Sequence, residues 1–328
     1  MPARKLYAAI DIGGTKVSVL LVDENYRVVA RGKKKTRPDK GFNGVLERVK
    51  ECLTETAATA KLSVNGLQLA GVAVPSPVLP TGVAVNAPNM GWRNAPVTKS
   101  LEKLLGVPVV TENDGNTGAY GEYALGAGKK AAAQLLIGFF IGTGLGGGIV
   151  YHGDLMRGVN YQAAEVGHTI VEVNGRRCGC GKRGCLEAYA SKTGMGYYLK
   201  QQIICEKRAS VLTELCAGGN YDNVRSGILL EAYEAGDAVT VEAVTEAARY
   251  MGIGIGNIIT LLGPDMVVLG GGVFAALGKE MLPIIKEAAK SATHPASSFR
   301  DTKILPAALG DDSVALGALA YARATTKQ

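Results

Sequence analysis

Residues 6–23 read LYAAIDIGGTKVSVLLVD, two apolar runs joined by a glycine turn. The alternation of side chains in Leu6–Ile12 and again in Val17–Asp23 predicts two strands. Between them, Gly13-Gly14-Thr15-Lys16 predicts a tight turn. The stretch is therefore expected to form a β-hairpin at the start of a sheet.

The same arrangement recurs near the middle of the chain. Leu135–Ile141 is predicted to be a strand, Gly142–Gly148 a glycine loop, and Ile149–Tyr151 another strand. Mixed strand and helix patterns follow both copies, and no low-complexity linker separates them. The sequence thus predicts two related α/β domains that pack closely, with a cleft between them.

The other elements are predicted from periodicity. Apolar residues at helical spacing define one face of a helix over residues 43–60, namely Val45, Leu46, Val49, Leu53 and Ala57. Further strands are expected at 28–33, 67–74, 107–110 and 266–269, and helices at 98–105, 279–291 and 314–325. Residues 86–95 are expected to form a loop and residues 193–262 to be mostly helical. The glycines at 252, 254 and 256 lie in a helical segment, which favours close helix packing over a dinucleotide fingerprint.

Composition is that of a soluble globular protein. The chain has 328 residues, 47% hydrophobic and 20% charged, a length that favours two domains. Six cysteines and no apolar secretory segment at the N-terminus indicate reduced thiols in a cytosolic protein. The longest uncharged run, residues 135–150, holds too many glycines for a bilayer span, so no membrane partner is expected.

The net charge of +7 is spread along the chain. The one dense basic run, Arg31–Lys35, is interpreted as a solvated strand end or loop, so no nucleic-acid partner is expected. A mildly basic surface also suits an anionic substrate such as a nucleoside triphosphate.

Three glycine-rich turns each follow a predicted strand, at residues 11–16, 142–148 and 270–272. Glycine lets the backbone approach a ligand closely and turn its N–H groups toward phosphate oxygens. A single glycine turn is usually only a turn, but three after three strands favour a phosphate site. None has the spacing of a P-loop.

Two acidic residues end predicted strands. Asp11 could hold a hydrated Mg²⁺ beside phosphates, or could simply hydrogen-bond its own turn. Asn113-Asp114-Gly115-Asn116 has the composition of a turn, but it ends a strand where the cleft between the domains is expected. A carboxylate at Asp114 could accept a proton from a hydroxyl that attacks a phosphoryl group.

Further candidate site residues lie between Glu165 and Glu187. His168, Cys178, Cys180 and Cys185 make a four-ligand set typical of structural zinc, and glycines between the cysteines suit a tight metal knuckle. The alternative is three buried cysteines without a metal. A catalytic zinc is disfavoured because four protein ligands leave no open position. The two glutamates place a carboxylate beside each end of the set.

Taken in order, these motifs resemble those of the ROK family of sugar kinases and sugar-responsive repressors, most closely its bacterial glucokinases. The resemblance rests on Asp-x-Gly-Gly-Thr-Lys, Asn-Asp-x-Asn, Gly-Thr-Gly-x-Gly-Gly-Gly, Glu-x-Gly-His, Cys-x-Cys-Gly-x2-Gly-Cys-x-Glu and a late Leu-Gly-Gly-Gly. It extends from Ala9 to about Ala320. In one departure, Ser76 stands in Pro75–Leu79 where the family often has glycine in Pro-Gly-Pro-Val-Asp, a segment that often lines the sugar pocket.

The resemblance implies a two-domain α/β fold of the actin-like ATPase (ribonuclease H-like) type, with a cleft between the domains. Residues 1–115 with 313–328 would form a small N-terminal domain, and residues 116–312 a large domain carrying the zinc knuckle. ATP and Mg²⁺ are the implied cofactors, with structural Zn²⁺. The nucleotide-binding residues implied are Asp11, Gly13, Gly14, Thr15, Lys16, Gly142, Thr143 and Gly144 for the phosphates, and Gly270, Gly271 and Gly272 near the adenosine.

The resemblance also implies the sugar site. Asp114 would be the catalytic base on the sugar 6-hydroxyl. The residues expected to hydrogen-bond the sugar are Asn89, Asn113, Asp114, Glu165, His168 and Glu187. In this family the histidine can bind zinc through one ring nitrogen and sugar through the other, as expected for a metal-bound histidine of fixed tautomer.

The expected activity is ATP-dependent phosphorylation of glucose. Kinases for N-acetylmannosamine, N-acetylglucosamine or fructose share most of these motifs and are the alternative. A sugar-responsive repressor is disfavoured because only ten residues precede Asp11, and a zinc-finger nucleic-acid binder because no basic recognition helix follows the cysteines. The partners expected are a small-molecule sugar and a nucleotide, in a homodimer or homotetramer.

Overall fold

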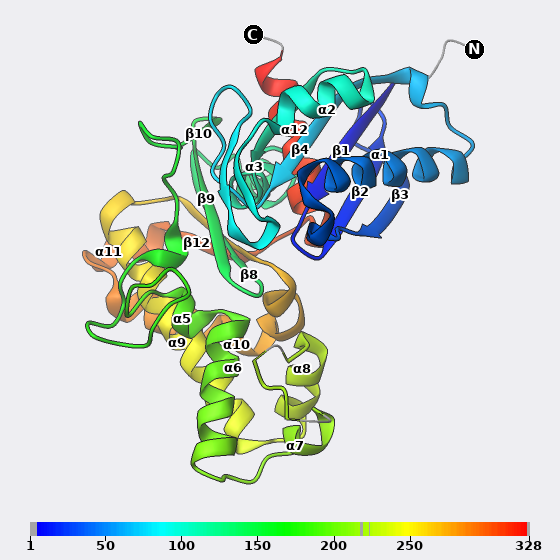
Figure 1. Cartoon of the computed structure of the whole chain (residues 1–328). Helices are drawn as coiled ribbons and strands as arrows, with labels where there is room; N and C mark the ends of the chain where they lie inside the picture. Colours follow the sequence, from blue (N-terminus) through cyan, green and yellow to red (C-terminus); the bar gives the residue numbers. More distant parts are fainter. Residues whose placement is uncertain (1–4, 217–218, 223, 327–328) are drawn as a thin grey trace. The chain divides into compact units, whose positions relative to one another are not determined.

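The computed structural model describes residues 5–216, 219–222 and 224–326 (Figure 1). The chain forms two compact units. The first comprises Met1–Ala132, Gly148–Ala164 and Asp311–Gln328, and the second comprises Ala133–Gly147 and Glu165–Gly310. In the described part of the chain, no helix has both the length and the apolar character needed to cross a membrane.

A five-stranded sheet with the order β3-β2-β1-β4-β7 is the frame of the first unit. Its strands are β1 (Leu6–Ile12), β2 (Lys16–Val22), β3 (Val28–Lys35), β4 (Leu67–Val74) and β7 (Val109–Asn113). β1 and β2 pair antiparallel, which confirms the predicted hairpin, and β4 lies parallel to both β1 and β7. The carboxyl ends of β1, β4 and β7 therefore share one edge of the sheet.

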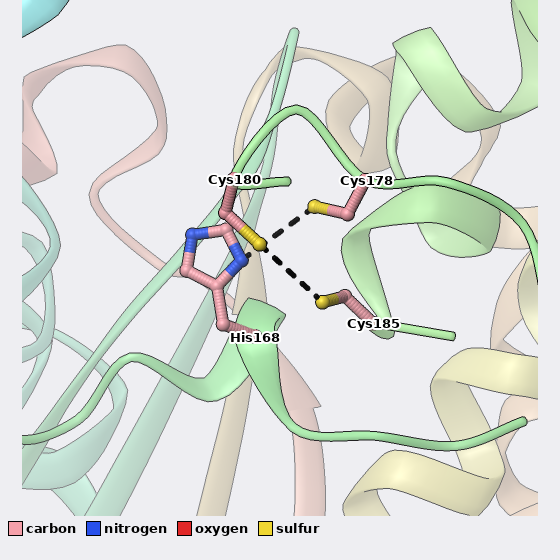
Figure 2. Close-up of side chains that lie close together, drawn as sticks. All are labelled: His168, Cys178, Cys180 and Cys185. Carbon is pink, nitrogen blue, oxygen red and sulfur yellow. Dashed lines mark hydrogen bonds between the residues drawn. The ribbon is translucent and has the colours of Figure 1, made fainter. Parts of the chain in front are cut away.

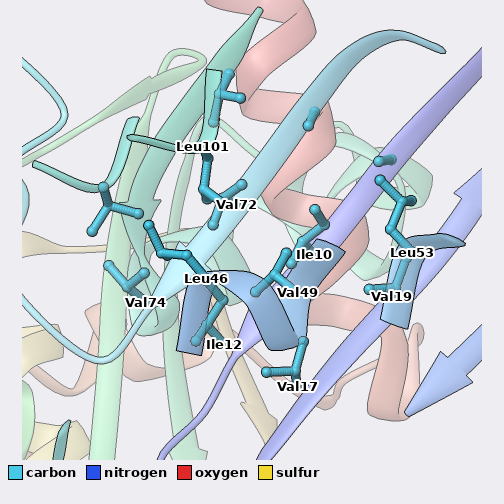
Figure 3. Packing of buried hydrophobic residues seen from close by; sticks show 14 of the residues in the cluster. Ile10, Ile12, Val17, Val19, Leu46, Val49, Leu53, Val72, Val74 and Leu101 are labelled. Carbon is cyan, nitrogen blue, oxygen red and sulfur yellow. The ribbon is translucent and has the colours of Figure 1, made fainter. Parts of the chain in front are cut away.

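Helices cover both faces of this sheet. They are α1 (Gly41–Thr59), α2 (Val97–Leu105), α3 (Asp114–Ala124), α4 (Ala127–Ala131) and α12 (Ser313–Thr325), with short 3₁₀ turns η1 (Pro38–Lys40), η2 (Val64–Gly66), η3 (Pro88–Met90) and η6 (Gly310–Asp312). The predicted apolar face of α1 is buried at Val45, Leu46, Val49, Leu53 and Ala57. Figure 3 shows Leu46, Val49 and Leu53 of α1 packed over Ile10, Val19 and Val72 of the sheet, in one apolar core.

Two elements of the first unit differ from expectation. The predicted loop 86–95 is wrong, because β5 (Ala84–Ala87) and β6 (Trp92–Ala95) pair antiparallel around η3. Their end residues are buried, so they gain the apolar contacts that a loop would lack. α3 begins within the segment whose composition indicated a turn. Its glycines and its burial on nearly every side hide the periodicity that would have predicted a helix.

α3 belongs to the first unit because it packs against α12. A Cβ at Gly317 of α12 would lie 1.8 Å from Thr117 O, and one at Gly121 would lie 2.4 Å from Ser313 O. The two helices thus touch through their backbones, which only glycine permits. The predicted domain boundary after residue 115 falls inside this helix, whereas the first unit continues to Ala132.

A second sheet repeats the strand order of the first, β10-β9-β8-β11-β12. Its strands are β8 (Leu135–Ile141), β9 (Leu145–Tyr151), β10 (Asp154–Leu155), β11 (Met266–Gly270) and β12 (Lys303–Pro306), with β11 parallel to β8 and β12. The predicted glycine loop 142–148 is too long, because β9 starts at Leu145. A Cβ at Gly147 would lie 2.6 Å from Gly138 O, so these glycines allow close packing within a strand.

The second unit includes residues 193–262, which are mostly helical in the described part, as predicted. Its helices are η4 (Val166–His168), α5 (Glu187–Ala190), α6 (Lys192–Lys200), the π-helical η5 (Gln201–Cys205), α7 (Leu212–Leu215), α8 (Ser226–Glu234), α9 (Ala238–Leu262), α10 (Gly272–Ala292) and α11 (Ala296–Asp301). A Cβ at Gly252 or Gly256 of α9 would lie 2.5 or 2.6 Å from an alanine Cβ of α10, which confirms close helix packing at these two glycines. α10 starts seven residues before the predicted helix (272 against 279).

Candidate functional site

Two carboxylates lie at the shared strand edge of the first unit. Asp11 is the second-last residue of β1, and Asp114 starts α3 directly after β7. Burial and the negative charge of Asp114 raise the pKa of Asp11 to about 7, while the positive charge of Lys16 opposes the shift. A cation beside Asp11 would favour its ionised form, so this pair fits a hydrated Mg²⁺.

The first glycine turn is held by a threonine outside the motif. Gly13 N donates to Lys16 O at 2.9 Å, closing the turn. The Thr36 hydroxyl donates to Gly13 O at 2.6 Å, and Thr36 N donates to Thr15 O at 3.0 Å. The carbonyl groups of the turn are thereby bound from one side. Thr15 and Lys16 stay exposed, which suits a turn that receives an anion.

The residues around Asp114 form a helix cap. Asn113 Oδ1 accepts from Asn116 N at 3.0 Å, a regular N-cap bond. Asp114 Oδ1 accepts from Gly115 N at 2.8 Å and from Asn113 Nδ2 at 3.1 Å. Two donors therefore fix one oxygen of the Asp114 carboxylate at the start of α3. Asn89, in η3 of the same unit, lies beside Gly14, since a Cβ at Gly14 would be 3.7 Å from the Asn89 Cβ.

In the second unit, two predicted glycine turns lie side by side. Gly142–Gly144 follows β8, and Gly270–Gly272 starts at the last residue of β11, the parallel neighbour of β8. Gly271 has φ +87°, and a Cβ there would lie 2.4 Å from Ile141 O, so only glycine fits. The first of these turns is bound to the start of α6, because Lys192 N donates to Gly142 O at 3.0 Å.

A glutamate joins this glycine turn to the cysteine segment. Glu187 Oε2 accepts from Leu145 N at 2.9 Å, and its Oε1 lies 3.5 Å from Cys178 Sγ. A Cβ at Gly144 would lie 2.5 Å from Glu187 Oε2, so any side chain there would displace the carboxylate. The carboxylate of Glu187 therefore lies between the Leu145 amide of β9 and the Cys178 thiol.

Glu165 immediately precedes η4, which carries His168. Its side chain remains accessible, yet the protein around the carboxyl group displaces water and raises its pKa. The proximity of His168 lowers this pKa, and that of Glu187 raises it. The structure therefore brings these three predicted sugar-binding residues into electrostatic contact with one another.

His168 and the three cysteines converge, as Figure 2 shows. One ligand atom from each lies within 4.8 Å of every other. His168 Nδ1 is 3.7 Å from Cys178 Sγ, and Cys180 Sγ is 3.7 Å from Cys185 Sγ. A tetrahedral zinc separates its nitrogen and sulfur ligands by roughly 3.5–3.8 Å. The donor set and its spacing thus fit one zinc ion.

The backbone of the cysteine segment turns on glycines. Gly181 and Gly184 have positive φ angles of 89° and 76°. A Cβ at Gly184 would lie 1.7 Å from Glu172 O, so no other residue fits there. Arg176, in the same segment but not one of the four candidate ligands, makes a bidentate ion pair with Glu246 of α9, at 2.7 and 2.9 Å. This pair fastens the segment to the helices of the second unit.

Comparison with known proteins gives a consistent answer. Residues 7–325 match the ROK family. The chain belongs to the ROK family. It is 33% identical over 288 residues to the glucokinase of Halalkalibacterium halodurans, which covers 86% of this chain and 84% of that protein. It is 32% identical over 320 residues to the glucokinase of Thermotoga maritima, covering 97% of each.

A solved ROK structure is similar over almost the whole chain. The ROK family glucokinase from Streptomyces griseus, crystallised with glucose and AMPPNP, matches with a TM-score of 0.84 at 32% identity, covering 97% of this chain and 99% of that one. The predicted actin-like ATPase fold, shared by ROK sugar kinases, is thereby confirmed.

The departure from the ROK pattern at Ser76 has a structural explanation. Ser76 is 2% exposed, and its hydroxyl donates to Pro77 O at 2.9 Å and accepts from Asn86 N at 3.0 Å. The side chain is thus used to fasten β5 to the end of β4.

Some residues around the ROK motifs were missed by the sequence analysis. Thr36, directly after β3, supports the first turn, and the backbone amide of Leu145 binds Glu187. A main-chain donor leaves no signal in a sequence. Glu112 was also missed, although a carboxylate that ends a buried strand just before Asn113 could have drawn attention.

Proposed function

We propose that this ROK protein is an ATP-dependent glucokinase, which transfers the γ-phosphoryl group of ATP to the 6-hydroxyl of glucose. The observation that carries the proposal is the Asp114 carboxylate, fixed at the start of α3 beside Asp11 and the first glycine turn. The choice of ATP and glucose as substrates is supported by the similarity to glucokinases, one of them solved with glucose and AMPPNP.

Asp114 is the proposed base. It accepts the proton of the attacking hydroxyl, while Gly115 N and Asn113 Nδ2 hold the Oδ1 atom and keep the carboxylate oriented. General-base catalysis contributes roughly 10²- to 10⁴-fold, and positioning with charge neutralisation supplies most of the rest. Magnesium, when bound, neutralises charge on the phosphate oxygens, and Asp11 would hold it through water.

The phosphate contacts are proposed for residues 13–16 and 142–144, and the adenosine contacts for residues 270–272. Backbone N–H groups of such turns bind phosphate oxygens directly. Lys16 adds a positive charge at the first turn. Both turns of the second unit end parallel strands, the usual place for a nucleotide in an α/β sheet.

Structural zinc is proposed at His168 and the three cysteines. Because Nδ1 of His168 faces Cys178, it is the nitrogen that binds the metal. Nε2 then carries the proton and is free to donate to a sugar hydroxyl. Asn89, Asn113, Glu165 and Glu187 are proposed as further sugar contacts. A cytosolic location and a homodimer or homotetramer stay predictions.

A coupled kinase assay with Mg²⁺-ATP tests the proposal. We expect the highest kcat/KM for glucose in a panel that also contains mannose, fructose, N-acetylglucosamine and N-acetylmannosamine. A preference for an N-acetylhexosamine would move the protein to another kinase of the family. Sugar binding without turnover of any of them would favour the repressor class instead.

A further inference from the structure

Behind the Asn113–Asp114 cap lies a buried carboxylate. Glu112, in β7, is 2% exposed. Its Oε1 atom accepts from Asn113 N at 2.8 Å and from the Asn116 side-chain Nδ2 at 3.1 Å. These are the two residues that the N-cap bond joins. Glu112 therefore binds both ends of the cap that orients Asp114.

Arg157 supplies the opposite charge. It lies after β10 in the first unit, and its NH1 atom is 3.3 Å from Glu112 Oε2. Its guanidinium group also lies over the rings of Tyr161 and Tyr321, 5.6 Å from each centroid. A buried carboxylate without a counter-charge is costly, so the positive charge of Arg157 stabilises the ionised form of Glu112. The two aromatic rings fix where that counter-charge sits.

We propose that Arg157 is a positioning residue for phosphoryl transfer. Through Glu112 it fixes the cap, and through Asn113 Nδ2 the cap fixes the Asp114 carboxylate. In this chain of bonds Arg157 reaches Asp114 through Glu112 and Asn113. The catalytic part of the inference rests on the proposed kinase activity, whereas the structural part concerns only how the cap is held.

The size of the effect follows from geometry. A displacement of a reacting group by about 1 Å can cost roughly 10²-fold in rate. The Arg157–Glu112 contact is two hydrogen bonds away from the base, so its loss loosens the cap without removing any substrate ligand. We therefore expect the Arg157→Ala variant to lose kcat by about 10- to 100-fold, with the KM for Mg²⁺-ATP nearly unchanged.

Guanidinium ion separates positioning from mere stabilisation. In Arg157→Ala, added guanidinium chloride at millimolar concentration should occupy the emptied position, pair with Glu112 and restore much of kcat. Sodium chloride at equal ionic strength should not. In the double variant Arg157→Ala, Glu112→Gln, the ion has no anion to bind, so guanidinium should restore nothing.

Arg323→Ala is the matched control. Arg323 lies over two tyrosine rings of the same unit, Tyr7 at 4.8 Å and Tyr26 at 4.5 Å, and donates to Glu24 O at 2.8 Å. Truncating it removes a similar stack with no link to the cap. We expect its kcat to stay within about twofold of wild type, with no response to guanidinium.

Hydrogen exchange provides a readout that does not need activity. Peptides that cover residues 113–118 should exchange faster in Arg157→Ala than in wild type or Arg323→Ala, and should recover with guanidinium. If wild type phosphorylates no sugar, the proposed function fails, and this exchange result alone decides whether Arg157 holds the cap.

Three outcomes would overturn the inference. In the first, kcat and exchange at 113–118 are unchanged in Arg157→Ala. In the second, both change only in parallel with the melting temperature and guanidinium restores neither. In the third, guanidinium rescues the double variant as well as the single one. Should Arg157→Ala not fold, Glu112→Gln, which keeps the shape of the side chain, must show the loss of kcat and the faster exchange.

Discussion

The proposed site residues fall into two sets, one in each compact unit, which are built in opposite ways: a regular half at Asn113 and Asp114, and an irregular half at residues 165–187. Asn113 and Asp114 lie where a regular strand ends and a regular helix begins, so ladder and cap hydrogen bonds fix them. Residues 165–187 contain only η4, two isolated bridges and the start of α5. There, glycine turns and four converging ligand atoms do the same work. Where the backbone lacks regular hydrogen bonds, side-chain cross-links must supply the rigidity.

The largest expected effect concerns the regular half. Asp114→Asn keeps the shape and the cap but removes the base, so kcat should fall roughly 10²- to 10⁴-fold while glucose still binds. Steady-state kinetics with calorimetric titration of glucose measures both. Asp39→Asn, at an exposed aspartate of the same unit, is the control. A kcat near the wild-type value would show that Asp114 is not the base.

The next effect concerns the irregular half. Cys180→Ala should release the metal and weaken glucose binding about 10- to 100-fold, because His168 and Glu187 lose their support. Metal analysis, glucose titration and hydrogen exchange test this together. Exchange should rise in 165–187 and stay unchanged in 109–124. Cys205→Ala, at an exposed cysteine outside the cluster, should change nothing. Lost metal with unchanged glucose affinity would refute the supporting role of the cluster.

A smaller effect is expected next to the irregular half. Ala164, which precedes Glu165, has φ +68°, a conformation that strains any residue with a Cβ. Ala164→Gly should raise the free energy of unfolding by about 1 kcal/mol. Its neighbour Ala163 has no positive φ, so Ala163→Gly should lower stability by up to about 1 kcal/mol. Urea unfolding measures both, and equal changes in the two variants would contradict the explanation by strain.

The smallest expected effect tests the buried support of the regular half. Burial raises the pKa of Glu112 above its ordinary value of 4.5, although hydrogen bonds from Asn113 and Asn116 and the charge of Arg157 oppose this. The unfolded chain therefore ionises first as pH rises, and the native state binds more protons in that window. Stability should fall as pH increases from about 4.5 to the native pKa of Glu112 and then level off.

Replacing the carboxyl group isolates this contribution. In Glu112→Gln the fall should be smaller than in wild type, as measured by urea unfolding across pH 4–8. Glu47→Gln, at an exposed glutamate of α1, serves as the control. Parallel stability curves for wild type and Glu112→Gln would show that the carboxyl group does not titrate differently on folding.

The regular elements could be predicted because apolar periodicity reports burial directly. The hairpin Leu6–Val22, the buried face of α1 and the repeat at Leu135 all follow from it. α3 and β5–β6 could not be predicted in this way. α3 is buried on nearly all sides, so it has no polar face to set against an apolar one, and the β5–β6 hairpin is too short for alternation to be seen.

The candidate site divides along the same line. His168 and the three cysteines could be predicted as a set because histidine and cysteine are the usual ligands of zinc. The residues that support the rest of the site could not be predicted. Thr36, the Leu145 amide and Arg157 act through contacts between residues far apart in sequence, and their types are common everywhere. Only the folded chain shows that Thr36 binds the Gly13 carbonyl, the Leu145 amide binds Glu187, and Arg157 binds Glu112.

The hydrogen bond from Leu145 N to Glu187 joins the strand that follows the Gly142–Gly144 turn to a carboxylate proposed to bind sugar. A sugar that hydrogen-bonds to the Glu187 carboxylate changes the free energy of the turn proposed to bind phosphate. The two ligands are then linked thermodynamically: the factor by which sugar changes nucleotide affinity must equal the factor by which nucleotide changes sugar affinity. One main-chain donor can thus make the binding of acceptor and donor substrates cooperative.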